Sequence, residues 1–135
     1  MPHPSPYLPE KAVSGGMEAR LLGKWGEQLV AQDLRKRGWQ VVMVNYRCRH
    51  GEVDIIAADK RYLVFVEVKL RRSGQYGQPR EFVTGEKQRK LRAAAELYLV
   101  ENPTRLQPRF DVAEVFAPQG MKTPKPEIFY VENAF

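Results

Sequence analysis

Two strand-like runs joined by a short charged turn constrain the fold of this chain more than any other feature of its sequence. The runs cover residues 52–58 and 62–70, and the turn between them is Asp59-Lys60-Arg61. A connection this short is typical of a β-hairpin, so the two strands are expected to pair antiparallel. The register of such a hairpin decides which side chains face each other, because side chains alternate between the two faces of a sheet.

Two helices and three further strands are predicted around the hairpin. Apolar residues recur at helical spacing from residue 18 to about residue 37, and Gly38 is a typical C-terminal stop. Thr84 can cap a second helix that ends near residue 101. Strands are predicted over residues 39–46, 110–116 and 127–132, and the first of them is expected to be buried on both faces. The order α-β-β-β-α-β-β indicates an α/β fold with a mixed central sheet flanked by helices.

The chain length of 135 residues allows one ordinary domain. Residues 1–15 carry four prolines, and we expect them to form a disordered tail ahead of a single domain over residues 16–135. Residues 71–83 contain Gly, Ser and Pro and interrupt the strand pattern, so they are expected to form a mobile surface loop.

The hairpin predicts that two carboxylates lie side by side. If Lys60 and Arg61 form the turn, residue 59 pairs with residue 62, and Asp54 lies directly opposite Glu67 on one face of the ladder. Opposed side chains have Cβ atoms about 4.5–5.5 Å apart, where two negative charges repel each other. The pair therefore requires a cation or a shared proton.

Four further side chains join these carboxylates in a candidate site. Asp54 and Glu67, with a backbone carbonyl and water, would suit Mg²⁺ or Mn²⁺. Lys69 shares a strand face with Glu67 and would orient or deprotonate the water that attacks a phosphodiester. Glu27 lies on the helix stripe expected to face the sheet. Lys87 and its neighbour Gln88 lie in the first turn of the second helix, where the helix N-terminus favours a phosphate.

The same residues also suit a structural ion cluster without a metal. In that alternative Lys69 neutralises one carboxylate, Glu27 is solvated at the edge of its helix, and Lys87 is an ordinary exposed lysine. Residue spacing alone favours neither interpretation of the carboxylates and Lys69, whereas for Lys87 it favours an ordinary exposed lysine.

The charge balance favours a polyanionic partner. Lysine and arginine outnumber aspartate and glutamate by 22 to 16, which gives a net charge of +6. Basic residues flank the carboxylates, and we expect nucleic acid to be bound by Arg47, Arg49, Arg71, Arg72 and Lys87.

The composition excludes several classes of protein, among them membrane-spanning, disulfide-bonded and zinc-stabilised ones. No apolar run approaches the roughly 20 residues of a membrane helix, so no membrane partner is expected. Cys48 is the single cysteine, so it can form no internal disulfide and leaves too few soft ligands for structural zinc. The N-terminal residues lack the apolar core of a signal peptide, so a cytoplasmic location is expected. The sequence leaves open whether the chain is a homodimer.

The motifs around these residues resemble the PD-(D/E)xK nuclease superfamily, which includes restriction endonucleases and archaeal Holliday junction resolvases. They are Gly51-Glu52-Val53-Asp54 and Phe65-Val66-Glu67-Val68-Lys69. More closely, residues 20–135 resemble the YraN-type family of small bacterial proteins. This closer resemblance is carried by Gly26-Glu27, Asn45-Tyr46-Arg47, Glu67-Val68-Lys69-Leu70-Arg71, Lys87-Gln88 and Arg109-Phe110-Asp111-Val112. The proline that names the superfamily motif is replaced by Val53.

The resemblance implies a restriction-endonuclease-like core and a role for each site residue. Asp54 and Glu67 correspond to the metal ligands, Lys69 to the catalytic lysine, Glu27 to the helix-borne acidic residue, and the pair 87–88 to substrate-contacting residues. We therefore expect a Mg²⁺- or Mn²⁺-dependent endonuclease that acts on DNA, with branched and single-stranded DNA as the candidate forms; the preference for branched DNA is implied by the resemblance alone. The alternatives are a non-catalytic nucleic-acid-binding or scaffolding module and, third, a domain whose basic face binds an acidic protein.

Overall fold

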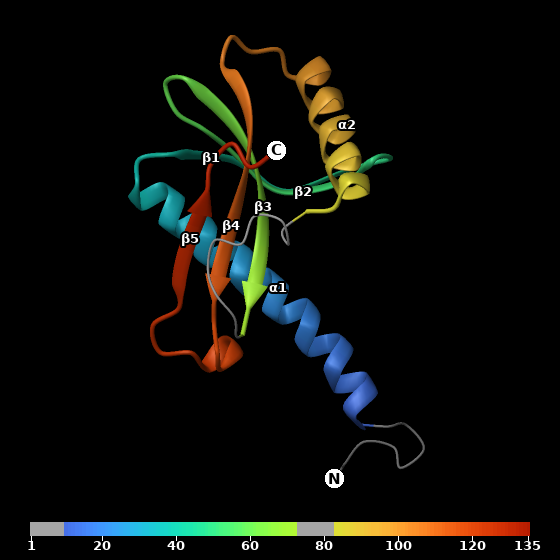
Figure 1. Ribbon diagram of the computed structural model, residues 1–135, viewed down its shortest axis with the longest axis vertical. Helices are drawn as coiled ribbons and strands as arrows, with labels where there is room; N and C mark the ends of the chain where they lie inside the picture. The colour runs from blue at the N-terminus through green and yellow to red at the C-terminus, as the bar shows by residue number, and fades with distance from the viewer. Residues whose placement is uncertain (1–9, 73–82) are drawn as a thin grey trace.

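A five-stranded sheet lies between two helices in the computed structural model, which describes residues 10–72 and 83–135 (Figure 1). The elements follow in the order α1 (Glu10–Lys36), β1 (Gln40–Cys48), β2 (Gly51–Ala58), β3 (Tyr62–Arg71), α2 (Gly85–Glu101), β4 (Gln107–Phe116), the 3₁₀ helix η2 (Gly120–Lys122) and β5 (Glu127–Val131). The predicted order of helices and strands is confirmed, and η2 was not predicted. The protein is an α/β domain with a nuclease-like arrangement of its elements.

The strands lie in the order β1-β2-β3-β4-β5 across the sheet. Strands β3 and β4 run parallel, whereas the other neighbouring pairs are antiparallel, so the predicted mixed sheet is confirmed. The parallel pair is possible because α2 lies between β3 and β4 in the chain and returns it to the same end of the sheet.

Each face of the sheet is covered by one helix. On one face, the buried α1 residues Val30 and Leu34 pack against a cluster that includes Val64 of β3. On the other, Leu91 of α2 packs against a cluster that includes Phe65. Successive residues of β3 thus enter opposite cores, and the strand is apolar on both faces until it reaches Glu67.

The end of α1 and the start of α2 lie where the sequence predicts them. Gly38 has a φ of 96° after α1, and the backbone N–H of Trp39 donates to the carbonyl of Leu34. At the start of α2 the hydroxyl of Thr84 accepts a hydrogen bond from the backbone N–H of Lys87. This cap fixes the first turn of α2, which carries two of the predicted site residues.

Two expectations about the N-terminal half are wrong. Helix α1 begins at Glu10 rather than near residue 18. No proline follows Pro9 in this stretch, so its backbone N–H groups remain available for helical hydrogen bonds. Strand β1 is not buried on both faces: it is an edge strand, and Val42, Met43 and Val44 are about 40% exposed.

The remaining predictions about irregular segments fall largely outside the described residues. They concern residues 1–9 of the expected tail and residues 73–82 of the expected loop. Within the described ranges, neither helix has the length and apolar composition needed to cross a membrane.

Candidate functional site

The register of the β2–β3 hairpin agrees with the prediction. The backbone N–H of Asp59 donates to the carbonyl of Tyr62, and Ile55 pairs with Val66. The next pair in the same register is Asp54 with Glu67. The backbone pairing of β2 with β3 ends before this pair. Instead, the side-chain oxygen Oδ2 of Asp54 accepts a hydrogen bond of 2.8 Å from the backbone N–H of Val68. Asp54 is therefore held at the point where β2 leaves β3.

The surroundings of the Asp54 carboxyl group disfavour its charged form. Burial raises its pKa from 3.8 to about 7, and the nearby charge of Glu67 adds to the effect, although the N–H of Val68 opposes it. Glu27 of α1 forms a side-chain hydrogen bond with Asp54. The pKa of Glu27 is also raised, mainly by burial, because that hydrogen bond only partly offsets burial and the charges of Glu52 and Glu67.

Glu67 is nearly inaccessible and is contacted by two ammonium groups. Its side chain is 6% exposed; Lys87 Nζ lies 3.2 Å from Glu67 Oε2, and Lys69 Nζ lies 3.6 Å from the same oxygen. Lys69 comes from β3 itself, whereas Lys87 reaches across from the first turn of α2. The site therefore joins both helices to the centre of the sheet.

The described structure thus brings together five of the predicted residues: Glu27, Asp54, Glu67, Lys69 and Lys87. Among residues 10–72 and 83–135, no three His, Cys, Asp or Glu side chains are arranged to hold a metal ion by themselves. Two carboxylates completed by backbone carbonyl oxygen and water still fit the oxygen preference of Mg²⁺ and Mn²⁺. Two adjacent acidic groups, one with a raised pKa, are the charge pattern that a bound cation would relieve.

The other predicted substrate residues are spread more widely. Arg47 is exposed and pairs with Glu52 at 3.1 Å, and Arg49 is exposed. Gln88 donates from its side chain to the carbonyl of Val83. Arg72 lies against Gly120 of η2, where a Cβ atom would meet Arg72 Nη2 at 3.1 Å. Among these residues, only Arg47 acts on a site carboxylate, since its charge lowers the pKa of Glu27.

The sequence analysis missed a further buried carboxylate next to the site, that of Glu114. Glu114 of β4 is 1% exposed, lies beside Lys69 in the parallel ladder, and accepts a hydrogen bond of 2.8 Å from Arg71 Nε. The available signal was a glutamate among the apolar residues 112–116, at a position whose side chain lies on the sheet face opposite α1. Arg71, expected to bind substrate, thus has a buried partner.

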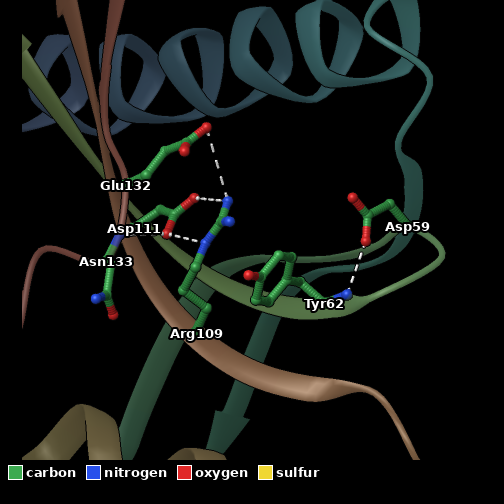
Figure 2. Close-up of polar contacts among 6 residues, drawn as sticks. All are labelled: Asp59, Tyr62, Arg109, Asp111, Glu132 and Asn133. Carbon is green, nitrogen blue, oxygen red and sulfur yellow. Dashed lines mark hydrogen bonds and ion pairs between the residues drawn. The ribbon is translucent and has the colours of Figure 1, made fainter.

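Asp111, to which the sequence assigned no role, belongs to a different cluster on the α1 face (Figure 2). It accepts two hydrogen bonds from Arg109, of 2.9 and 2.8 Å, and one of 3.0 Å from the backbone N–H of Asn133. The Arg109 guanidinium lies 4.5 Å from the centre of the Tyr62 ring and 3.8 Å from Glu132 Oε2. This cluster anchors the C-terminal residues to β4.

Comparison with known proteins places these features in a family. Residues 26–115, which include every predicted site residue, match the model described as "Uncharacterised protein family UPF0102". The chain is 43% identical over 118 residues to a UPF0102 protein of Syntrophomonas wolfei, which covers 86% of this chain and 98% of that protein. It is 50% identical over 95 residues to one of Syntrophotalea carbinolica, covering 70% and 77% of the two chains. It is 44% identical over 115 residues to one of Rhodococcus opacus, covering 84% and 95%. The chain belongs to the UPF0102 family.

Proposed function

We propose that this protein is a metal-dependent phosphodiesterase that cuts DNA and belongs to the PD-(D/E)xK superfamily. The observation that carries the proposal is the meeting of Asp54, Glu67 and Lys69 where β2 and β3 part, with the pKa of Asp54 raised to about 7. Grouped carboxylates with a raised pKa destabilise the fold, so their presence beside a lysine favours a functional site.

Mg²⁺ or Mn²⁺ is the cofactor that this donor set suits, with Asp54 and Glu67 as its protein ligands. When bound, such an ion stabilises negative charge on phosphoryl oxygens. Asp54 must be ionised to act as a ligand, because a protonated carboxyl group is a poor one. Glu27, which lies beside Asp54, would accept a hydrogen bond from the attacking water.

Lys69 and Lys87 act on the substrate in this proposal. Both ammonium groups lie within 4 Å of the same oxygen of Glu67, so a phosphate that approaches Glu67 meets both cations. Lys69 is the catalytic residue: it orients the attacking water and offsets charge that develops on the phosphate oxygens. Lys87 binds the phosphate at the start of α2, where the helix dipole also favours an anion.

DNA is the proposed substrate because the net charge is +6 and basic side chains surround the carboxylates. The test is incubation of the purified protein with linear duplex, single-stranded and four-way-junction DNA, with Mg²⁺, with Mn²⁺ and with chelator. Cleavage of at least one substrate is expected only with the metals. Equal cleavage in chelator, or no cleavage of any substrate, would contradict the proposal.

A non-catalytic nucleic-acid-binding module is the second candidate. It is favoured by the two lysines on Glu67, which neutralise this carboxylate without a metal. In that case the protein binds DNA equally well with metal or chelator and leaves it intact.

A further inference from the structure

We propose that Glu114 is a positioning residue that holds Arg71 in place to bind a phosphate of the substrate next to the one contacted by Lys69. This inference rests on the proposed function, because it needs nucleic acid at the Asp54–Glu67 site. It assigns a role to a buried carboxylate that the catalytic proposal does not use.

The placement of the two residues carries the inference. Glu114 lies next to Lys69 in the parallel β3–β4 ladder and on the sheet face opposite α1, the same face as Glu67. Arg71 follows Lys69 by two residues on the same strand face, a step of about 6.6 Å along the strand. This step is comparable to the separation of neighbouring phosphates in a nucleic acid strand. One face of β3 thus presents the ammonium group of Lys69 and the guanidinium group of Arg71 in succession.

The energetics favour a positioning role over a purely structural one. A carboxylate that is 1% exposed loses its hydration, and a well-packed apolar side chain in its place would be about as stable or more stable. The charge of Glu114 therefore needs a reason other than stability. Its carboxylate holds the Nε edge of Arg71 at 2.8 Å, while the Arg71 side chain is 29% exposed and so reaches solvent at the site. A guanidinium already held in one direction loses less conformational entropy when a phosphate binds.

The Arg109–Asp111 pair provides an internal comparison (Figure 2). It has the same chemistry and a distance of 2.8 Å, but Arg109 is only 12% exposed and is surrounded by Tyr62, Glu132 and Asp111. Its interactions connect β4 to the C-terminal residues, on the sheet face opposite the carboxylate site. A substitution in this pair should therefore lower stability without changing the binding of DNA.

The test is a double-mutant cycle on the affinity for a fluorescently labelled linear duplex, measured in chelator at several salt concentrations. Arg71→Ala is expected to weaken binding about five- to ten-fold and to reduce the slope of log affinity against log salt by about 1, since one phosphate contact is lost. Glu114→Gln keeps the shape and an acceptor oxygen, and is expected to weaken binding about three-fold with little change in slope. In the Arg71→Ala background, Glu114→Gln should have no further effect, because Glu114 acts through Arg71.

Two further variants keep the result decisive. Arg71→Lys retains the charge but not the guanidinium fork, so its affinity should fall about three-fold; this expectation can be tested even if Glu114→Gln fails to fold. Asp111→Asn is the matched control and should lower the melting temperature while leaving affinity unchanged. Additive effects of Arg71→Ala and Glu114→Gln on affinity, or parental affinity in Arg71→Lys, would overturn the positioning role.

Cleavage with Mn²⁺ separates the failure of this inference from failure of the proposed function. If the parent cleaves DNA and the cycle shows no coupling, only the role of Glu114 is wrong. If the parent neither binds DNA in chelator nor cleaves it with Mn²⁺, the proposed function fails, and this inference fails with it.

Discussion

Replacing Asp54 with asparagine should stabilise the metal-free protein while removing its response to metal. The pKa of Asp54 rises from 3.8 in the unfolded chain to about 7 in the fold, chiefly through burial and the charge of Glu67. At about 1.36 kcal/mol for each pKa unit, the ionised side chain costs the folded state about 4 kcal/mol. Asparagine carries no charge and keeps an oxygen that can accept the hydrogen bond from Val68, so it should recover a large part of this free energy.

The raised pKa also determines how the stability difference between Asp54→Asn and the parent changes with pH. The folded state retains the Asp54 proton up to about pH 7, whereas the unfolded chain releases it near pH 4, so the parent loses stability as the pH rises between these values. The advantage of Asp54→Asn should be absent below pH 4, grow up to about pH 7 and stay constant above it. The assay is urea unfolding of both proteins in chelator at pH 4, 5.5, 7 and 8.

Metal provides the second half of the test. Mn²⁺ at about 100 times its dissociation constant should stabilise the parent by about 2.7 kcal/mol and leave Asp54→Asn unchanged. The control is Glu86→Gln, which also removes one negative charge but from a side chain that is 71% exposed, and should change stability by less than about 0.5 kcal/mol at every pH. The reasoning is refuted if Asp54→Asn is less stable than the parent at pH 8 in chelator.

Three further predictions follow from the same structure. Asp54→Ala should abolish binding of Mn²⁺, whereas Lys69→Ala should retain it because both carboxylate ligands remain; calorimetric titration with Mn²⁺ compares them. The affinity for DNA should fall steeply with salt, because several basic side chains displace counterions, and a flat dependence in a fluorescence titration would favour an acidic protein as the partner. Asp111→Asn should lower the free energy of unfolding by about 1–3 kcal/mol, measured with urea, because the Arg109 guanidinium loses its buried counter-charge.

The register of the candidate site could be predicted because it depends on local chemistry. The turn at residues 60–61 is closed by the side chain of Asp59, which accepts hydrogen bonds from the backbone N–H groups of Arg61 and Tyr62. Once this turn is fixed, alternation along the strands places Asp54 opposite Glu67 without reference to the rest of the fold. The alternation of β3 between two apolar faces could be read from the sequence in the same way.

The features that escaped prediction depend on neighbours distant in the chain. The apolar residues of β1 suggested a strand buried on both faces, but a run of valines does not indicate whether a strand lies at the edge of the sheet. The partnership of Arg71 with Glu114 follows from the parallel pairing of β3 with β4, which only the tertiary structure reveals. The hydrogen bond between Glu27 and Asp54 likewise depends on how α1 packs against the sheet.

Single-turnover cleavage by three identically purified proteins tests the central claim most directly. The parent, Lys69→Ala and Asp54→Ala are each incubated in excess over a labelled DNA substrate with Mn²⁺ and, in parallel, with chelator. We predict that the parent cleaves only with Mn²⁺ and that neither variant cleaves, while Lys69→Ala binds the DNA within a few-fold of the parent. Cleavage by both variants at the parental rate would contradict the claim, because the activity would then not come from these residues.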